Sequence, residues 1–215
     1  MIKKHLQALG LASMLAASPA LANGDIDFEI GDGKVVPSES FAAMVSVLGT
    51  AITFRGDNVP VTVKAQIGDN ILEPWGEFSS TLGDVNDNGP IRHFIYEEQL
   101  DAGEEIVISG QSFLRGSSFI SVNSHEQSDA VKVLRNGDPA PTISGFDGQS
   151  TAEFFIRQYL ANGQVNIDDN QVIYLFELGT TQLTSSAADF QDLVVLVTLG
   201  ESVEALQNRF EPLYD

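Results

Sequence analysis

Hydrophobic residues along this chain recur mostly with the two-residue period of β-strands. Residues 61–67, Val-Thr-Val-Lys-Ala-Gln-Ile, alternate between apolar and polar positions, which is typical of a half-buried strand. Short runs of this kind are separated by Gly, Asn, Asp or Pro, and this spacing favours a sandwich or barrel over alternating strands and helices. The other short strands that we expect span residues 26–30, 44–54, 92–96, 105–109, 119–122 and 130–134.

Two later runs are almost continuously apolar, at residues 172–178 and 193–199, which predicts strands that are buried on both faces or central in a sheet. One helix is expected near 150–162, because Ser150 and Glu153 form a capping box ahead of an apolar stripe. Residues 201–215 are expected to form a short C-terminal helix or a tail. The pattern predicts a mainly β fold, an antiparallel β-sandwich of jelly-roll or immunoglobulin-like type with one short helix.

The first 22 residues have the layout of a secretory signal peptide. Lys3 and Lys4 precede a short apolar run, and the segment ends on Ala20-Leu21-Ala22, a small-residue cleavage site. We therefore expect a secreted protein, extracellular or periplasmic. Residues 23–40 are expected to be a flexible acidic lead that could add a strand to a neighbour's sheet, and residues 41–200 a single β-sandwich domain.

Charge and composition narrow the possible partners. The chain has 30 acidic and 11 basic residues, a net charge of −19, and no cysteine. Such a surface repels nucleic acid and anionic membranes and attracts divalent cations. Solubility and specific ion binding both remain explanations of the charge. Zinc–thiolate sites, iron–sulfur clusters and cysteine nucleophiles are excluded, and no second apolar run is long enough for membrane insertion.

Two acidic segments are candidate calcium sites, because calcium prefers six to eight hard oxygen ligands. In the first, Asp84, Asn86 and Asn88 alternate ahead of Gly89, but Ile95 occupies the position where an EF-hand has its bidentate Glu. A calcium loop of another kind and a plain turn remain the alternatives.

In the second segment, Glu177 ends one predicted strand while Asp189 and Asp192 lead into the next. If the two strands pair, the three carboxylates meet at one end of the sheet, where they repel unless a cation or hydrogen-bond donors hold them. Both a metal site and separate hydrogen-bonded carboxylates remain open.

This C-terminal region resembles an uncharacterised domain of bacterial secreted and surface proteins. The resemblance covers residues Tyr174–Leu199 and rests on an F-E element, a polar loop and a D-F-x-D motif that enters a hydrophobic strand. The matching residues here are Phe176, Glu177, Asp189, Phe190 and Asp192. Ala187 replaces the first acidic residue of the family pattern. The resemblance implies an extracellular β domain, associated with adhesins or matrix proteins, that uses calcium and has no established catalysis.

Other functional signals are weaker. Trp75, the only tryptophan, lies in a turn-rich acidic segment and could stack on a sugar ring or anchor a loop on the core. A secreted hydrolase would need His93 or His125 in a cleft with a carboxylate and a nucleophile, and no catalytic motif places them there. The tripeptide Arg55-Gly56-Asp57 we interpret as a simple glycine turn.

The sequence thus predicts a secreted, acidic, calcium-stabilised β-sandwich with a structural or adhesive role in the matrix, at the cell surface or in a surface assembly. Its expected partners are further copies of itself or surface and matrix components, and not nucleic acid. The alternatives are a carbohydrate-binding module centred on Trp75 and a secreted hydrolase, and we expect no enzyme activity.

Overall fold

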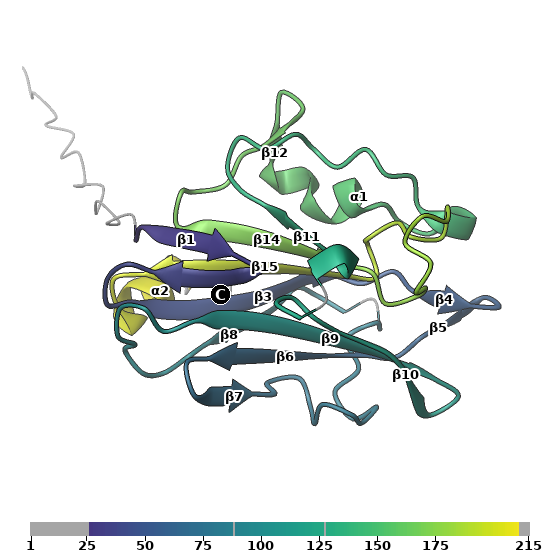
Figure 1. Ribbon diagram of the computed structural model, residues 1–215, viewed down its shortest axis with the longest axis horizontal. Helices are drawn as coiled ribbons and strands as arrows, with labels where there is room; N and C mark the ends of the chain where they lie inside the picture. The colour runs from purple at the N-terminus through teal and green to yellow at the C-terminus, as the bar shows by residue number, and fades with distance from the viewer. Residues whose placement is uncertain (1–25, 88, 127, 211–215) are drawn as a thin grey trace, which may run out of the picture.

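The computed structural model of the protein describes residues 26–87, 89–126 and 128–210. Two antiparallel sheets pack face to face, with two short helices beside them (Figure 1). The expected mainly β, antiparallel sandwich is therefore confirmed. The proposed signal peptide, residues 1–22, lies outside the described residues. No helix in the described ranges is long and apolar enough to span a membrane.

The first sheet is organised around strand β9. Strand β6 pairs with one edge of β9, and β2 and β10 pair with the other. The sheet comprises β1 (Phe28–Gly31), β2 (Lys34–Pro37), β6 (Val61–Ile67), β7 (Asn70–Leu72), β9 (Ile106–Leu114) and β10 (Ser117–Asn123).

The second sheet has the spatial order β11-β14-β15-β3-β8. Its strands are β3 (Ala42–Gly49), β8 (Arg92–Ile95), β11 (Val131–Leu134), β14 (Gln171–Phe176) and β15 (Leu193–Gly200). Strands β14 and β15 are buried at every position, as their continuous apolar runs predict.

The remaining elements are short. They are the hairpin strands β4 (Thr53–Phe54), β5 (Asp57–Asn58), β12 (Leu160–Ala161) and β13 (Gln164–Val165), the helices α1 (Ala152–Ile156) and α2 (Val203–Phe210), and the 3-10 turns η1 (Ser128–Ala130), η2 (Phe146–Gly148) and η3 (Arg157–Tyr159).

The second sheet has apolar residues on both faces, and each face packs on a different layer. In β15, Val195 belongs to the core between the sheets, whereas Leu196 packs in a second cluster with Ile156 of α1. Helix α2 covers a third patch, where Leu206 contacts Met44. Both faces of this sheet are therefore covered.

The segment 23–40, expected to be a flexible lead, differs from that expectation over its described part. Strands β1 and β2 form an antiparallel hairpin, and Val35 pairs with Ile106 of the first sheet. Ile26 and Val35 are buried in the main core, so hydrophobic burial orders this segment. The sandwich therefore includes residues before 41. The segment that was expected to add a strand to a neighbour's sheet is already paired within its own chain.

The helix expected near 150–162 is shorter than the capping box predicts. Thr151, not Ser150, is its N-cap, and the Thr151 side chain accepts a hydrogen bond from the Phe154 amide at 3.1 Å. Helix α1 then gives way to η3 and the β12–β13 hairpin.

Gly49 ends strand β3 where helix α1 crosses the sheet. A Cβ at this position would lie only 2.0 Å from Cδ1 of Phe155. The absence of a side chain therefore lets the Phe155 ring approach the backbone, and this contact places α1 against the second sheet.

Candidate metal centre

The turn between β14 and β15 brings the three C-terminal carboxylates together. Phe176 pairs with Leu193 across the two strands, so Glu177 and Asp192 follow and precede a paired position at one end of the sheet. Glu177, Asp189 and Asp192 are all buried, and each offers a carboxylate oxygen within 4.8 Å of the others. They form the one group of three potential metal ligands in the described part of the chain. We call these three residues the carboxylate centre.

Glu177 organises both ends of the turn through four backbone hydrogen bonds. Its Oε1 accepts from the amides of Gly179 at 3.0 Å and Thr180 at 2.9 Å, and its Oε2 accepts from those of Asp189 at 2.9 Å and Phe190 at 3.3 Å. Four backbone amides therefore stabilise the negative charge of Glu177.

Phe190 has the backbone conformation that makes this possible. Its φ of 55° is in the left-handed region, which a bulky residue rarely adopts. Successive amides in such a conformation can converge on one anion, and those of Asp189 and Phe190 converge on Glu177 Oε2. The Phe190 ring is covered by Lys132, whose Nζ lies 4.3 Å from the ring centroid.

The two aspartates have fewer hydrogen-bond partners. Asp192 Oδ2 accepts from the Leu178 amide at 2.6 Å, and Asp189 Oδ2 accepts from the Phe146 amide, also at 2.6 Å. Asp189 thereby ties η2 to the turn between β14 and β15. Each aspartate retains lone pairs that no backbone amide occupies, so these two residues have the capacity to bind a cation directly.

Burial changes the ionisation of both aspartates. Loss of solvation, together with repulsion from Glu177, raises the pKa of Asp192 well above its usual value, and the Glu177 carboxyl is close enough for a hydrogen bond between the two groups. Burial also raises the pKa of Asp189, against the opposing effect of its hydrogen bonds with Phe146 and Gln191. Three negative charges in this environment repel strongly, so either a proton or a cation is needed.

Gln191 is a neighbour of the carboxylate centre that the sequence did not single out. Its side chain is fully buried and forms a hydrogen bond with Asp189. The same side-chain amide contacts Ala51 O at 3.2 Å and the Gln149 amide at 2.6 Å. Gln191 therefore links the centre to the loop between β3 and β4 and to the segment before α1, and its position inside the D-F-x-D motif was the available signal.

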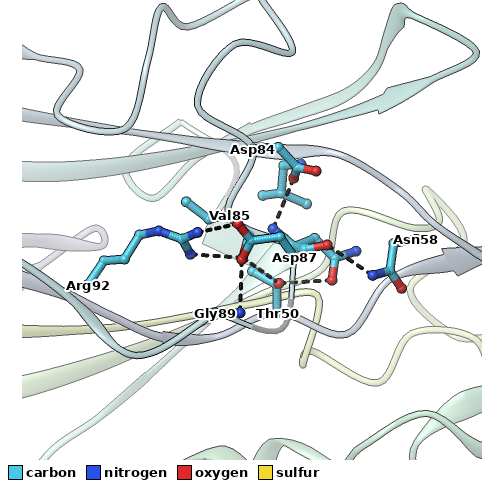
Figure 2. Close-up of polar contacts among 9 residues, drawn as sticks. Thr50, Asn58, Asp84, Val85, Asp87, Gly89 and Arg92 are labelled. Atoms are coloured by element: carbon cyan, nitrogen blue, oxygen red, sulfur yellow. Dashed lines mark hydrogen bonds and ion pairs between the residues drawn. The ribbon is translucent and has the colours of Figure 1, made fainter.

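The residues of the other predicted calcium loop serve the fold individually (Figure 2). Asp84 Oδ1 accepts from the amides of Val61 at 2.8 Å and Asn86 at 2.9 Å. The buried Asn86 amide donates to Ile52 O at 2.7 Å and to Val59 O at 2.8 Å. These bonds are those of a turn that joins loops on the core, which was the alternative to a metal loop.

Asp87 in the same loop is paired with a cation from the protein itself. It contacts Arg92 at 2.5 Å (Figure 2), and this ion pair lowers the pKa of Asp87. Asn88, the third predicted ligand, lies outside the described residues. Asp84 belongs to no group of three potential His, Cys, Asp or Glu ligands in the described chain, in contrast to the carboxylate centre.

Trp75 is partly buried and packs against the main core. This contact is the one expected of a loop anchor, although part of the side chain remains accessible.

The two histidines of the described chain lie in different settings. His93 Nδ1 and Ser46 Oγ are 2.8 Å apart on neighbouring strands, and burial lowers the pKa of His93. Ser46 itself is fully buried, and Ser46 and His93 both line a hollow of about 200 Å³. His125 is exposed, with Nδ1 3.1 Å from Asp32 O. The structure does not gather both histidines at one cleft.

Comparisons with protein-family models, with curated proteins and with solved structures found no match to this chain. The case for a function therefore rests on the chemistry of the described residues.

Proposed function

We propose that the protein is a secreted structural or adhesive β-sandwich whose carboxylate centre binds calcium. The observation that carries the proposal is the burial of three carboxylates within 4.8 Å of one another. None of the ion pairs in the described ranges involves them. A divalent cation would remove their repulsion, and carboxylate and amide oxygens are the ligands that calcium prefers.

The calcium would hold loops together and would not perform chemistry. Asp189 reaches η2 and Asp192 reaches the end of β14, so an ion bound to both would fasten three segments at one end of the sandwich. A secreted protein in a calcium-rich medium gains stability from such an ion by mass action. The matrix or cell-surface role rests on the expected signal peptide, the acidic surface and the sequence resemblance.

The test is the thermal midpoint of the purified protein in EDTA and in millimolar calcium. Calcium at about 100 times its dissociation constant adds about 2.7 kcal/mol, which is about 5–10 °C for a domain of this size. We expect that shift in the unmodified protein and its loss in the double variant Asp189→Asn/Asp192→Asn.

The matched control is Asp84→Asn, which removes one charge from the other acidic loop but keeps the oxygen that accepts the Val61 amide. This variant should retain the calcium shift. Equal midpoints in EDTA and in calcium for the unmodified protein would contradict the proposal and would mean that protons alone neutralise the centre.

A further inference from the structure

Four hairpins in the described part of the chain close with the same two-residue turn. In each, both turn residues have positive φ, the signature of a type I′ turn. The four turns and their φ values are Asp32-Gly33 (49°, 75°), Arg55-Gly56 (56°, 88°), Arg115-Gly116 (54°, 77°) and Asn162-Gly163 (54°, 78°).

Two of these turns have a residue that the conformation disfavours. The first position of a type I′ turn prefers Asn, Asp or Gly, and Asp32 and Asn162 follow that preference. Arg55 and Arg115 do not. A left-handed conformation is unfavourable for an ordinary L-residue, and residues held in such conformations cluster at ligand-binding sites. The hairpins that turn at Asp32 and Asn162 have the preferred residues, and they show what an ordinary type I′ turn of this chain looks like.

The two arginine turns lie together although they are 60 residues apart in sequence. The β4–β5 hairpin and the turn of β9–β10 occupy the same end of the sandwich (Figure 1), and the Phe113 amide donates to Pro60 O at 2.9 Å between them. Arg55 and Arg115 line one hollow of about 360 Å³. That volume is within the range of about 300–1,000 Å³ for small-ligand pockets.

The hollow presents positive charge on a strongly acidic protein. The ion pairs of the described residues use Lys34, Arg92 and Arg209, so neither turn arginine is neutralised by an ion pair with a described carboxylate. The Arg55 guanidinium lies 5.2 Å from the centroid of the Phe54 ring, which is 39% exposed. Guanidinium groups bind carboxylates through two parallel hydrogen bonds.

We propose that this hollow binds a carboxylate-bearing sugar unit of an anionic polysaccharide. The two guanidinium groups would bind the sugar carboxylate, the exposed Phe54 ring offers a stacking face, and Asp57, which also lines the hollow, would accept hydrogen bonds from sugar hydroxyls. An acidic peptide lacks those hydroxyls, so its carboxylates would be repelled by Asp57 with no hydrogen bond to compensate.

The acidic surroundings restrict the ligand further. A net charge of −19 repels a long, highly charged polyanion that lies across the surface, whereas one acidic sugar inserted between the two turns meets the arginines first. The inference supplies a partner class for the proposed adhesive role and rests on that role for its biological meaning. The binding itself uses none of the carboxylate-centre residues.

The experiment is isothermal titration of the purified protein with trigalacturonate in EDTA, because uronate oligomers themselves bind calcium. The variants Arg55→Asn and Arg115→Asn remove the charge but install a residue that the turn prefers, so their thermal midpoints should equal or exceed that of the unmodified protein. Hydrogen bonds to charged groups contribute about 1.5–3 kcal/mol, so each variant should weaken binding about tenfold or more.

Two controls separate this site from general charge effects. Arg157→Gln removes an exposed arginine that does not line the hollow and should leave the affinity unchanged. The fully methyl-esterified trimer, which has the same sugars without charge, should not bind measurably.

The proposal is overturned if trigalacturonate does not bind, if both arginine variants keep the full affinity, or if the esterified trimer binds equally well. A hexaglutamate peptide that binds as tightly as the sugar would also overturn it, because the site would then recognise carboxylates without the sugar. None of these outcomes depends on the calcium shift of the thermal midpoint, so the two proposals can fail separately.

Discussion

Replacement of Asp192 by Asn should abolish the calcium response and leave the metal-free protein at least as stable. An amide oxygen can still accept from the Leu178 amide, which now bonds Asp192 Oδ2 at 2.6 Å. The amide N–H groups can donate to Glu177, as a protonated Asp192 would. The substitution therefore reproduces the neutral state of the carboxyl group and removes the charge that a cation needs.

The burial of Asp192 determines whether the stability of the fold rises or falls with pH. Loss of solvation and repulsion from Glu177 raise the pKa of Asp192 well above its ordinary value of 3.8. A group with a raised pKa in the folded state stabilises the fold at low pH, and that contribution is lost as the pH rises through the folded-state pKa. Each pKa unit corresponds to about 1.4 kcal/mol.

In EDTA, the unmodified protein should therefore lose stability relative to Asp192→Asn on going from an acidic to a neutral pH, because the protonated form of Asp192 is the one that burial favours. A smaller loss should remain in the variant, because burial also raises the pKa of Asp189. With calcium at about 100 times its dissociation constant, the unmodified protein should gain about 2.7 kcal/mol. That gain should be larger at the higher pH, since protons compete with the metal for carboxylates.

The assay is urea denaturation of both proteins at the two pH values, in EDTA and in calcium, with the exposed Asp69→Asn as a charge-matched control. Two results would refute the reasoning: an equal calcium gain in Asp192→Asn and the unmodified protein, or an EDTA stability of the unmodified protein that rises with pH relative to the variant.

Three further substitutions test the surrounding structure by denaturation. Asn86→Ala should cost about 2–4 kcal/mol, because two backbone carbonyls lose their buried donor, while the calcium shift persists; a lost shift would assign that loop to metal binding. Gly49→Ala should cost about 1–3 kcal/mol by overpacking against Phe155, and Phe155→Leu should recover part of the loss if the contact is responsible. Thr151→Ala should cost about 1 kcal/mol through loss of the helix cap, whereas Ser150→Ala should have little effect; the opposite order would restore the cap expected from sequence.

The sequence by itself determined most strand positions, since a strand repeats its environment every two residues. Residues 61–67 form β6 as expected. The two continuous apolar runs form the doubly covered strands β14 and β15. Their pairing also placed Glu177 and Asp192 at one end of the sheet, because strand neighbours along the chain commonly pair.

Local sequence was less informative about the N-terminal hairpin. Its acidic and glycine-rich composition is typical of a mobile segment, yet Ile26 and Val35 are buried in the core. The burial of a few apolar side chains in a core formed by distant strands outweighs local composition, and no local pattern reveals whether such a core is available.

Tertiary structure alone decided the chemistry of the loops. The four amides around Glu177 come from both ends of one turn, and Arg55 and Arg115 meet only because their hairpins pack at the same end of the sandwich. Sequence periodicity reports how one strand faces a core. The positions of loops depend on contacts between layers, which are long-range and leave no periodic trace.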